Sequence, residues 1–146
     1  TRCLSDWSSD VCSSDLPQEQ LGTLWLSTTF DVGTGWMPIP DLGFVRAERV
    51  PAKSRKSIKA VPDLVVEIHS PTDLRSKPER DAAAQKIAEW QKVGVSLIWA
   101  INPQKREIEV YHPGQAKPVR VLHPQDELDG EKVIPGFKLK VSQLFT

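Results

Sequence analysis

The sequence has very few sulfur-containing residues and no long apolar run. Of its 146 residues only two are cysteines, and Cys3 and Cys12 both lie within the first sixteen residues. The rest of the chain therefore has no thiol for a disulfide, a zinc site or a nucleophile. No apolar stretch approaches the roughly 18 residues that a membrane-spanning helix needs, so we expect a cytoplasmic protein with no membrane partner.

Several sequence motifs of known chemistry are also absent. The chain has no G-x-x-x-x-G-K-[ST] loop, no G-x-G-x-x-G and no G-x-S-x-G. Its three histidines, His69, His112 and His123, lack a metal-ligand spacing such as i, i+4 on a helix. These absences argue against a P-loop or dinucleotide site, a serine-hydrolase elbow and a histidine-based metal centre.

The charges of the chain are evenly balanced. Nineteen Lys and Arg residues and nineteen Asp and Glu residues cancel, so net charge argues neither for nor against a nucleic-acid partner. Residues 52–59 concentrate four basic side chains, Lys53, Arg55, Lys56 and Lys59, which could contact phosphates. Because this segment has no aromatic residue to stack on bases, we interpret it as an exposed loop.

The first sixteen residues, TRCLSDWSSDVCSSDL, are rich in Ser and Asp and show no helix or strand periodicity. A disordered tail is one interpretation. A secretory leader is another, but no basic region followed by an apolar one is present. DWSSDVCSSDL matches the translation, in one frame, of a common short-read sequencing adapter. We therefore expect residues 1–16 to be a non-native, adapter-derived segment and residues 17–146 to form one domain that lacks its natural N-terminal region.

Patterns of strand and helix alternate along the rest of the chain. A helix is expected at residues 76–93, because Ser76 and Glu79 form a capping-box pattern and Gly94 follows as a C-terminal stop. Residues 64–68 form a nearly continuous apolar run, which is typical of a strand buried on both faces. Further strands are expected at residues 22–32, 40–45, 96–101, 107–111 and 119–122, with a short element at 141–145. This order predicts an α/β fold, with a mixed sheet and a helix on one face.

Glu67 is the residue that most clearly points to function. A carboxylate in a strand buried on both faces loses its hydration, and it persists only if it is paired, protonated or bound to a cation. Asp41 and Asp63 each follow a proline near the start of a predicted strand. Asp63 and Glu67 lie about 13 Å apart on an extended strand, which makes shared ligation of one Mg²⁺ difficult. Asp41, on a neighbouring strand, can reach a metal at Glu67 more easily, and Asp63 is then a turn residue or an additional acid.

Lys86 lies on the flank of the apolar stripe of the predicted helix, four residues before Trp90. Its stem can cover the core while its amine reaches a carboxylate, although an ordinary surface lysine occupies the same kind of position. Structural alternatives also exist for Glu67, namely a buried ion pair or a strand face open to solvent. His69 shares the strand face of Glu67 but is more typical of a surface group at a sheet end.

From Gly22 onward the chain resembles the Uma-two family, a restriction-endonuclease-like group common in bacteria. The resemblance rests on four stretches in order: IPDLGFV followed by RAERV, PDLVVEIHSPTD, KIAEWQKVGVSLIWAINPQKREIEVYHP and VIPGFKLKVSQLF. Each stretch is modest alone, but the ordered set is specific. It implies a PD-(D/E)xK nuclease core, in which acidic residues hold Mg²⁺ (or Mn²⁺) and a lysine lies near the scissile phosphate.

Transferred residue by residue, the resemblance implies that Asp41 and Glu67 are the metal-binding and catalytic acids, with Asp63 as an additional candidate. The simplest form of the motif has a lysine two residues after the glutamate, where this chain has His69. The lysine of this family comes instead from the following helix, which points to Lys86. Relatives carry a further acidic residue in a helical region before the first strand, and that region is absent here.

Three hypotheses follow from the sequence. The first is a Mg²⁺-dependent DNA endonuclease, with DNA as its partner and a homodimer expected by analogy. The second is a catalytically inactive nuclease-fold module that binds nucleic acid or a protein partner. The third is an interaction domain in which Glu67 merely pairs with a basic residue. Convergence of Asp41, Glu67 and Lys86 favours the first, and a basic residue against Glu67 with no room for a cation favours the third.

Overall fold

The computed structural model describes residues 21–52 and 56–145, so the sixteen-residue N-terminal segment and part of the basic loop lie outside it. Its centre is a six-stranded sheet in which the strands lie in the same order as in the chain. Only β3 and β4 are parallel, and every other neighbouring pair is antiparallel. The mixed sheet predicted from the sequence is therefore confirmed. The strands are β1 (Gly22–Leu26), β2 (Leu42–Arg46), β3 (Leu64–Ile68), β4 (Leu97–Asn102), β5 (Glu107–Tyr111) and β6 (Arg120–Leu122).

Helix α1 (Lys77–Lys92) makes the crossover between the parallel strands β3 and β4. It begins at the expected capping box, in which the Ser76 side chain accepts from the Glu79 backbone and the Glu79 side chain accepts from the Ser76 backbone. It ends before Gly94, whose φ of 102° suits glycine. The buried side chains of α1, Ile87 and Trp90, pack against one face of the sheet.

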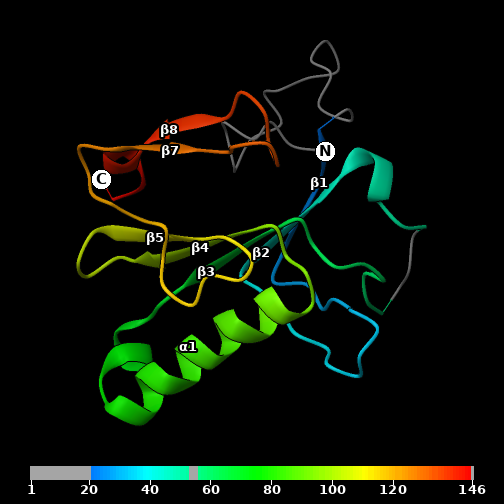
Figure 1. Ribbon diagram of the computed structural model, residues 1–146, viewed down its shortest axis with the longest axis horizontal. Coiled ribbons are helices and arrows are strands. Elements are labelled where there is room, and N and C mark those ends of the chain that lie inside the picture. The colour runs from blue at the N-terminus through cyan, green and yellow to red at the C-terminus, as the bar shows by residue number, and fades with distance from the viewer. Residues whose placement is uncertain (1–20, 53–55, 146) are drawn as a thin grey trace.

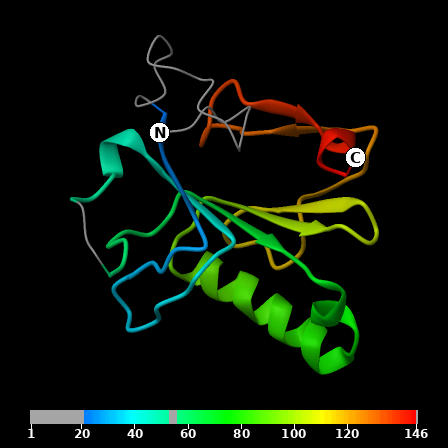
Figure 2. The same ribbon diagram turned by 180° about the vertical axis from the view of Figure 1, so that it is seen from behind.

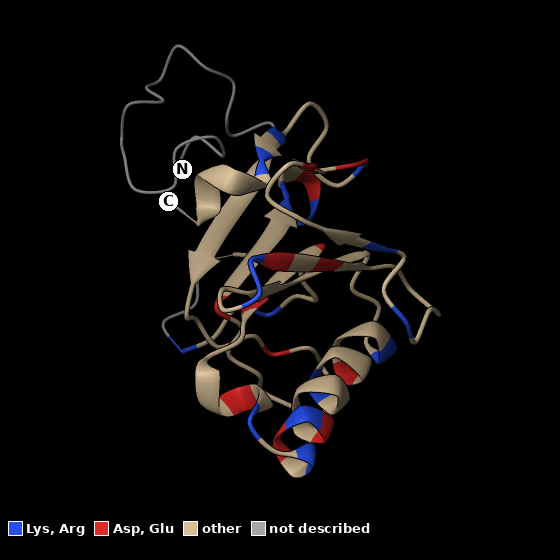
Figure 3. Ribbon diagram, turned by 90° about the vertical axis from the view of Figure 1, so that its left-hand side faces the viewer, with Lys and Arg blue, Asp and Glu red and all other residues tan. Residues whose placement is uncertain are grey.

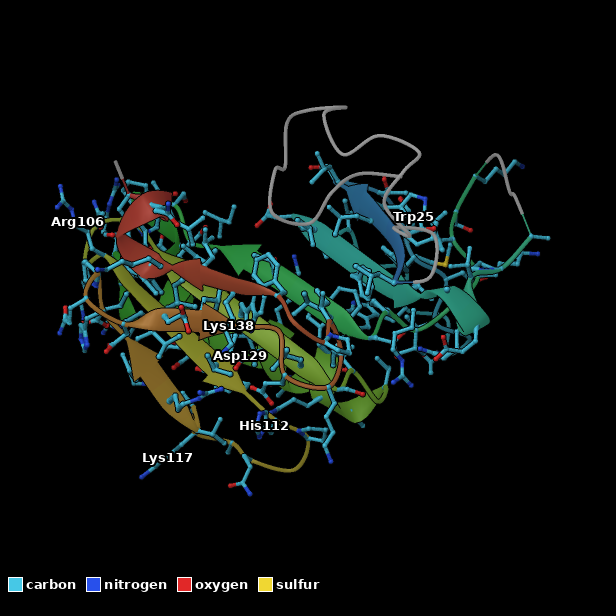
Figure 4. All side chains as sticks on the ribbon, turned by 90° about the horizontal axis from the view of Figure 1, so that it is seen from above. Trp25, Arg106, His112, Lys117, Asp129 and Lys138 are labelled. Atoms are coloured by element: carbon cyan, nitrogen blue, oxygen red, sulfur yellow. The ribbon has the colours of Figure 1, made fainter. Side chains whose placement is uncertain are left out.

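A small antiparallel hairpin covers the opposite face of the sheet (Figures 1 and 2). Its strands are β7 (Glu127–Asp129) and β8 (Lys138–Lys140), and Figure 4 looks down on them with Asp129 and Lys138 labelled. Between them, Phe137 stacks on Trp99 of the sheet, with ring centroids 5.9 Å apart. The sheet is thus enclosed between α1 and the hairpin, which explains why β3 and β4 are apolar on both faces.

The structure differs from the sequence-based expectations at the first strand, in the unexpected β7–β8 hairpin and in its short helices. The first strand ends at Leu26, because Ser27 has a positive φ of 45° and its N–H donates to the Asp41 carbonyl at 3.1 Å. The expected element at residues 141–145 is a 3₁₀ helix, η4 (Val141–Leu144). Two further 3₁₀ helices, η2 (Ala47–Arg49) and η3 (Pro71–Leu74), were not predicted. Within the part of the chain that the structure describes, no helix is long and apolar enough to cross a bilayer.

Alternation along β3 determines which side chains face the helix. Leu64 and Val66 belong to the core beneath the β7–β8 hairpin, whereas Val65 belongs to the core beneath α1. Because side chains alternate between the faces of a strand, Glu67 follows Val65 onto the α1 side. The carboxylate therefore emerges under the helix, near the carboxyl end of a central strand.

Candidate active site

Glu67 is buried and both of its carboxylate oxygens have partners on α1. Its exposed fraction is 7%, in a strand whose preceding three residues are also buried. The indole N–H of Trp90 donates to Oε2 at 2.8 Å. The Lys86 ammonium lies 3.3 Å from Oε1. Lys86 and Trp90 are four residues apart, so one helical face presents both donors to the same acid.

Burial raises the pKa of Glu67 above its ordinary value, since the charged form loses hydration under the helix. The nearby Lys86 charge and the hydrogen bonds from Trp90 and Lys86 lower this pKa, while the negative charge of Asp41 raises it. Burial has the largest effect, so the net direction is upward. An acid whose burial opposes its ionisation, beside a cation and a second acid, is typical of functional sites.

Asp41 lies immediately before β2 and joins this site through the backbone. Its Oδ2 accepts a hydrogen bond from the Ile68 N–H at 2.6 Å, which ties the start of β2 to the end of β3. Both carboxylates and the lysine border one open cleft of about 420 Å³. The cleft is lined by Asp41, Glu67, Ile68, His69, Thr72, Asp73, Glu79, Ala82, Ala83 and Lys86.

The structure therefore places Asp41, Glu67 and Lys86 on one cleft, and the catalytic and metal-binding roles expected for them stay predictions. His69 also lines the cleft, at the end of β3. The other two histidines lie in other contacts: His112 bonds Glu131 at 2.8 Å, and His123 is 3.6 Å from Glu107. Within residues 21–52 and 56–145, no three His, Cys, Asp or Glu side chains gather closely enough to hold a metal by themselves.

Sequence reasoning missed three residues at this site. Helix periodicity accounts for Trp90 as an apolar residue and does not show that its N–H serves a buried acid on the facing strand, which requires a donor. Asp73 and Glu79 also line the cleft. Their carboxylates accept backbone N–H groups at the starts of η3 and α1, at 2.7 Å from Ser70 and 2.9 Å from Ser76. The capping-box pattern identified the local role of Glu79 but could not show which cleft it faces.

Asp63 lies apart from the cleft and is part of a different contact. It is 5% exposed, directly before β3. One carboxylate oxygen pairs with the Arg49 guanidinium, and the other accepts the Arg46 backbone N–H at 2.8 Å. The structure therefore gives Asp63 a partner on η2 and does not place it beside Glu67.

Replacing Asp63 by asparagine is expected to lower stability without affecting the cleft. The substitution removes the negative charge that accepts from the Arg49 guanidinium and the Arg46 backbone N–H. This loss should reduce the free energy of unfolding by about 1–3 kcal/mol, as measured by urea denaturation. Metal affinity and any cleavage activity should stay unchanged. A loss of metal binding at unchanged stability would instead make Asp63 a site acid.

The raised pKa of Glu67 predicts that this residue lowers the stability of the metal-free protein as the pH rises. The folded chain binds the Glu67 proton more tightly than the unfolded chain, in which the pKa of this carboxyl has its ordinary value of 4.5. Protonation of Glu67 therefore adds to the free energy of unfolding below that pH. This contribution is lost as the pH rises through the higher pKa of the folded state. Because glutamine does not titrate, Glu67→Gln should gain in Tm relative to the native chain at about pH 8 but not at about pH 4. Thermal unfolding in EDTA measures this, and a Tm difference independent of pH would contradict it.

The donor set of the cleft fits a small hard cation. Mg²⁺ prefers oxygen ligands and is commonly held by one or two carboxylates, with water and substrate phosphate completing its coordination. Asp41 and Glu67 supply two carboxylates at one cleft, and an ionised carboxylate oxygen can accept more than one contact. The hydrogen bonds that they already accept therefore leave coordination capacity on both side chains.

The chain is an α/β protein in which one helix crosses a mixed sheet, and two acids and a lysine border one cleft near the carboxyl end of a central strand. Comparison with known families identifies its class more closely. Residues 3–142 match the Uma2 (Uma-two) family model, described as "putative restriction endonuclease". The chain belongs to the Uma2 family.

A solved structure has the same fold. It is a crystal structure of a protein from Anabaena variabilis, described as a "putative nuclease", with a TM-score of 0.70 and 23% sequence identity. The similarity covers 88% of this chain and 70% of the other. No curated protein matches the sequence significantly.

Proposed function

We propose that this protein is a metal-dependent DNA endonuclease that hydrolyses phosphodiester bonds. The observation that carries this proposal is the meeting of Asp41, Glu67 and Lys86 at one open cleft. Asp41 and Glu67 would hold Mg²⁺ or Mn²⁺, and Lys86 would face the phosphate. Membership of a family described as "putative restriction endonuclease" supports the same reaction class.

Each of these side chains has a chemical task in the proposed reaction. A bound Mg²⁺ would supply Lewis acidity and lower the pKa of a water bound to it. The two carboxylates would hold and partly neutralise that cation within a partly buried site, where electrostatic interactions are stronger than in water. The Lys86 ammonium would place a positive charge where negative charge develops on the phosphoryl group.

Basic residues beside the cleft support a phosphate-bearing substrate. Arg75, Lys77 and Arg80 are all exposed, and they lie on the η3–α1 segment that also contributes Asp73 and Glu79 to the cleft. Figure 3 shows basic and acidic residues gathered at this end of α1. Contacts from such side chains to the DNA backbone would position a strand without reading its sequence. DNA as the substrate, a homodimer and a cytoplasmic location stay predictions.

The cleft also bears on the two competing hypotheses. A salt bridge between Lys86 and Glu67 alone is what a purely structural ion pair would give. However, the pair borders an open volume of about 420 Å³, which leaves room for a hydrated cation and a phosphate group. This volume favours a binding or catalytic site over a structural pair. A catalytically inactive module that binds nucleic acid would have the same cleft, so only a cleavage assay distinguishes it from a nuclease.

Incubation of the full chain with supercoiled plasmid tests the proposal. We expect nicked and then linear DNA in Mg²⁺ or Mn²⁺, and none in EDTA. A gel-shift assay in Ca²⁺ should report binding independently of cleavage. Binding without cleavage by the folded protein in either metal would favour the inactive module, and neither binding nor cleavage would contradict both nucleic-acid hypotheses.

A further inference from the structure

The two donors on Glu67 differ sharply in their freedom to move. Trp90 is fully buried at 0% exposure, and its ring also contacts Trp36 edge-on at a centroid distance of 4.9 Å. The Lys86 side chain, in contrast, is 41% exposed and lines the open cleft. The indole is therefore held by packing, whereas the ammonium can change position at little cost.

This difference gives the two oxygens of Glu67 separate environments. Oε2 accepts the indole N–H at 2.8 Å on the core side. Oε1 lies 3.3 Å from Lys86 on the cleft side. A cation entering the cleft would compete with the exposed ammonium for Oε1, whereas the indole that donates to Oε2 is held by its packing in the core.

We propose that Trp90 is the positioning residue for Glu67: its indole N–H anchors Oε2 and so presents Oε1 to a divalent cation in the cleft. This inference rests on the proposed function, because it concerns how the same site binds its metal. Groups that orient a metal ligand typically change metal affinity by about 10- to 100-fold when they are removed. Trp90 touches neither metal nor substrate in this account, so it acts only through Glu67.

The chain contains a matched control for this indole. Trp99 is also buried, at 1% exposure, but it lies on the other face of the sheet and stacks on Phe137. Its indole nitrogen has no hydrogen-bond partner among the described residues. Trp90→Phe and Trp99→Phe therefore remove the same atoms from equally buried positions, and only Trp90→Phe removes a hydrogen bond to Glu67.

Calorimetric titration with Mn²⁺ in the absence of DNA tests the inference. We expect Trp90→Phe to weaken Mn²⁺ binding by about 10- to 100-fold, and Trp99→Phe to leave it within about twofold of the native chain. Trp90→Tyr keeps a ring with a donor and should recover part of the lost affinity. Equal Mn²⁺ affinity in Trp90→Phe and the native chain would overturn the inference while leaving the proposed function intact. Absence of Mn²⁺ binding by the native chain would overturn both.

A second measurement needs no substitution and so does not depend on how well a variant folds. In ¹H–¹⁵N spectra, addition of Mg²⁺ to the native chain should shift the indole N–H signal of Trp90 while that proton stays protected from solvent exchange. The Trp99 indole signal should not move. Loss of protection at Trp90 on Mg²⁺ addition would show that Glu67 leaves the indole, and this result would contradict an anchoring role.

Discussion

Glu67→Gln is expected to abolish metal-dependent cleavage almost completely, with a loss of about 100- to 1,000-fold. The substitution removes the negative charge of a metal ligand. Metal-derived stabilisation of a transition state amounts to several kcal/mol, and each 1.36 kcal/mol corresponds to a factor of ten in rate. Plasmid cleavage measured over a range of Mn²⁺ concentrations gives the comparison, and Mn²⁺ affinity should fall in parallel.

The fold of this variant should survive, which makes the result interpretable. Glutamine has nearly the same shape, and its amide oxygen can still accept the Trp90 N–H. Removal of a buried charge should even stabilise the metal-free protein at neutral pH, as expected from the raised pKa of Glu67. Lost activity with unchanged or higher stability is typical of an acid that is retained for function. Cleavage by Glu67→Gln at the native rate would mean that Glu67 is structural or that the activity belongs to a contaminant.

Lys86→Met is expected to lower the cleavage rate by about 100- to 1,000-fold while leaving Mn²⁺ binding intact or slightly tighter. Methionine keeps much of the aliphatic stem of Lys86, which lines the cleft, but it removes the positive charge proposed to face the phosphate. Loss of one such transition-state contact typically costs about 100- to 1,000-fold in rate. Loss of a cation beside Oε1 also removes a competitor for that oxygen.

Lys92→Met is the matched control for this substitution. Lys92 lies in the last turn of the same helix, is exposed and does not line the cleft. Single-turnover cleavage with each variant saturated in Mn²⁺ separates the rate from metal binding. An equal loss in both lysine variants would indicate a general electrostatic contribution to DNA binding, and an unchanged rate in Lys86→Met would exclude the lysine from the chemistry.

Much of the central architecture follows from local patterns in the sequence. The capping box at Ser76 and the stop at Gly94 place the helix within a residue of its observed bounds. The apolar runs of β3 and β4 predict strands buried on both faces. The β7–β8 hairpin was not predicted, because its three-residue strands are too short for alternation to be recognised. The early end of β1 depends on the positive φ of Ser27, which no residue pattern specifies.

The candidate site was also predictable in part from local sequence patterns. A charge within an apolar strand identified Glu67, and the flank position of Lys86 on the helix allowed their pairing. Asp41 and Asp63 both follow a proline, and only the four-residue separation of Asp63 from Glu67 favoured Asp41 as the metal-binding acid. Only the tertiary structure shows that Asp63 is bound to Arg49, whereas Asp41 is bonded to the end of β3. The role of Trp90 could not be read from helix periodicity, because an indole contributes to an apolar stripe whether or not its N–H has a buried acceptor.

A crystal structure of the protein with Mn²⁺, using anomalous scattering to locate the metal, tests the proposed metal site most directly. We expect an anomalous peak in the cleft, with oxygens of both Asp41 and Glu67 at about 2.2 Å and the Lys86 ammonium displaced from Oε1. We also expect the Trp90 indole still to donate to Oε2. A folded protein in Mn²⁺ with no metal between these carboxylates, and with the Lys86–Glu67 pair intact, would contradict a metal-dependent site at this cleft.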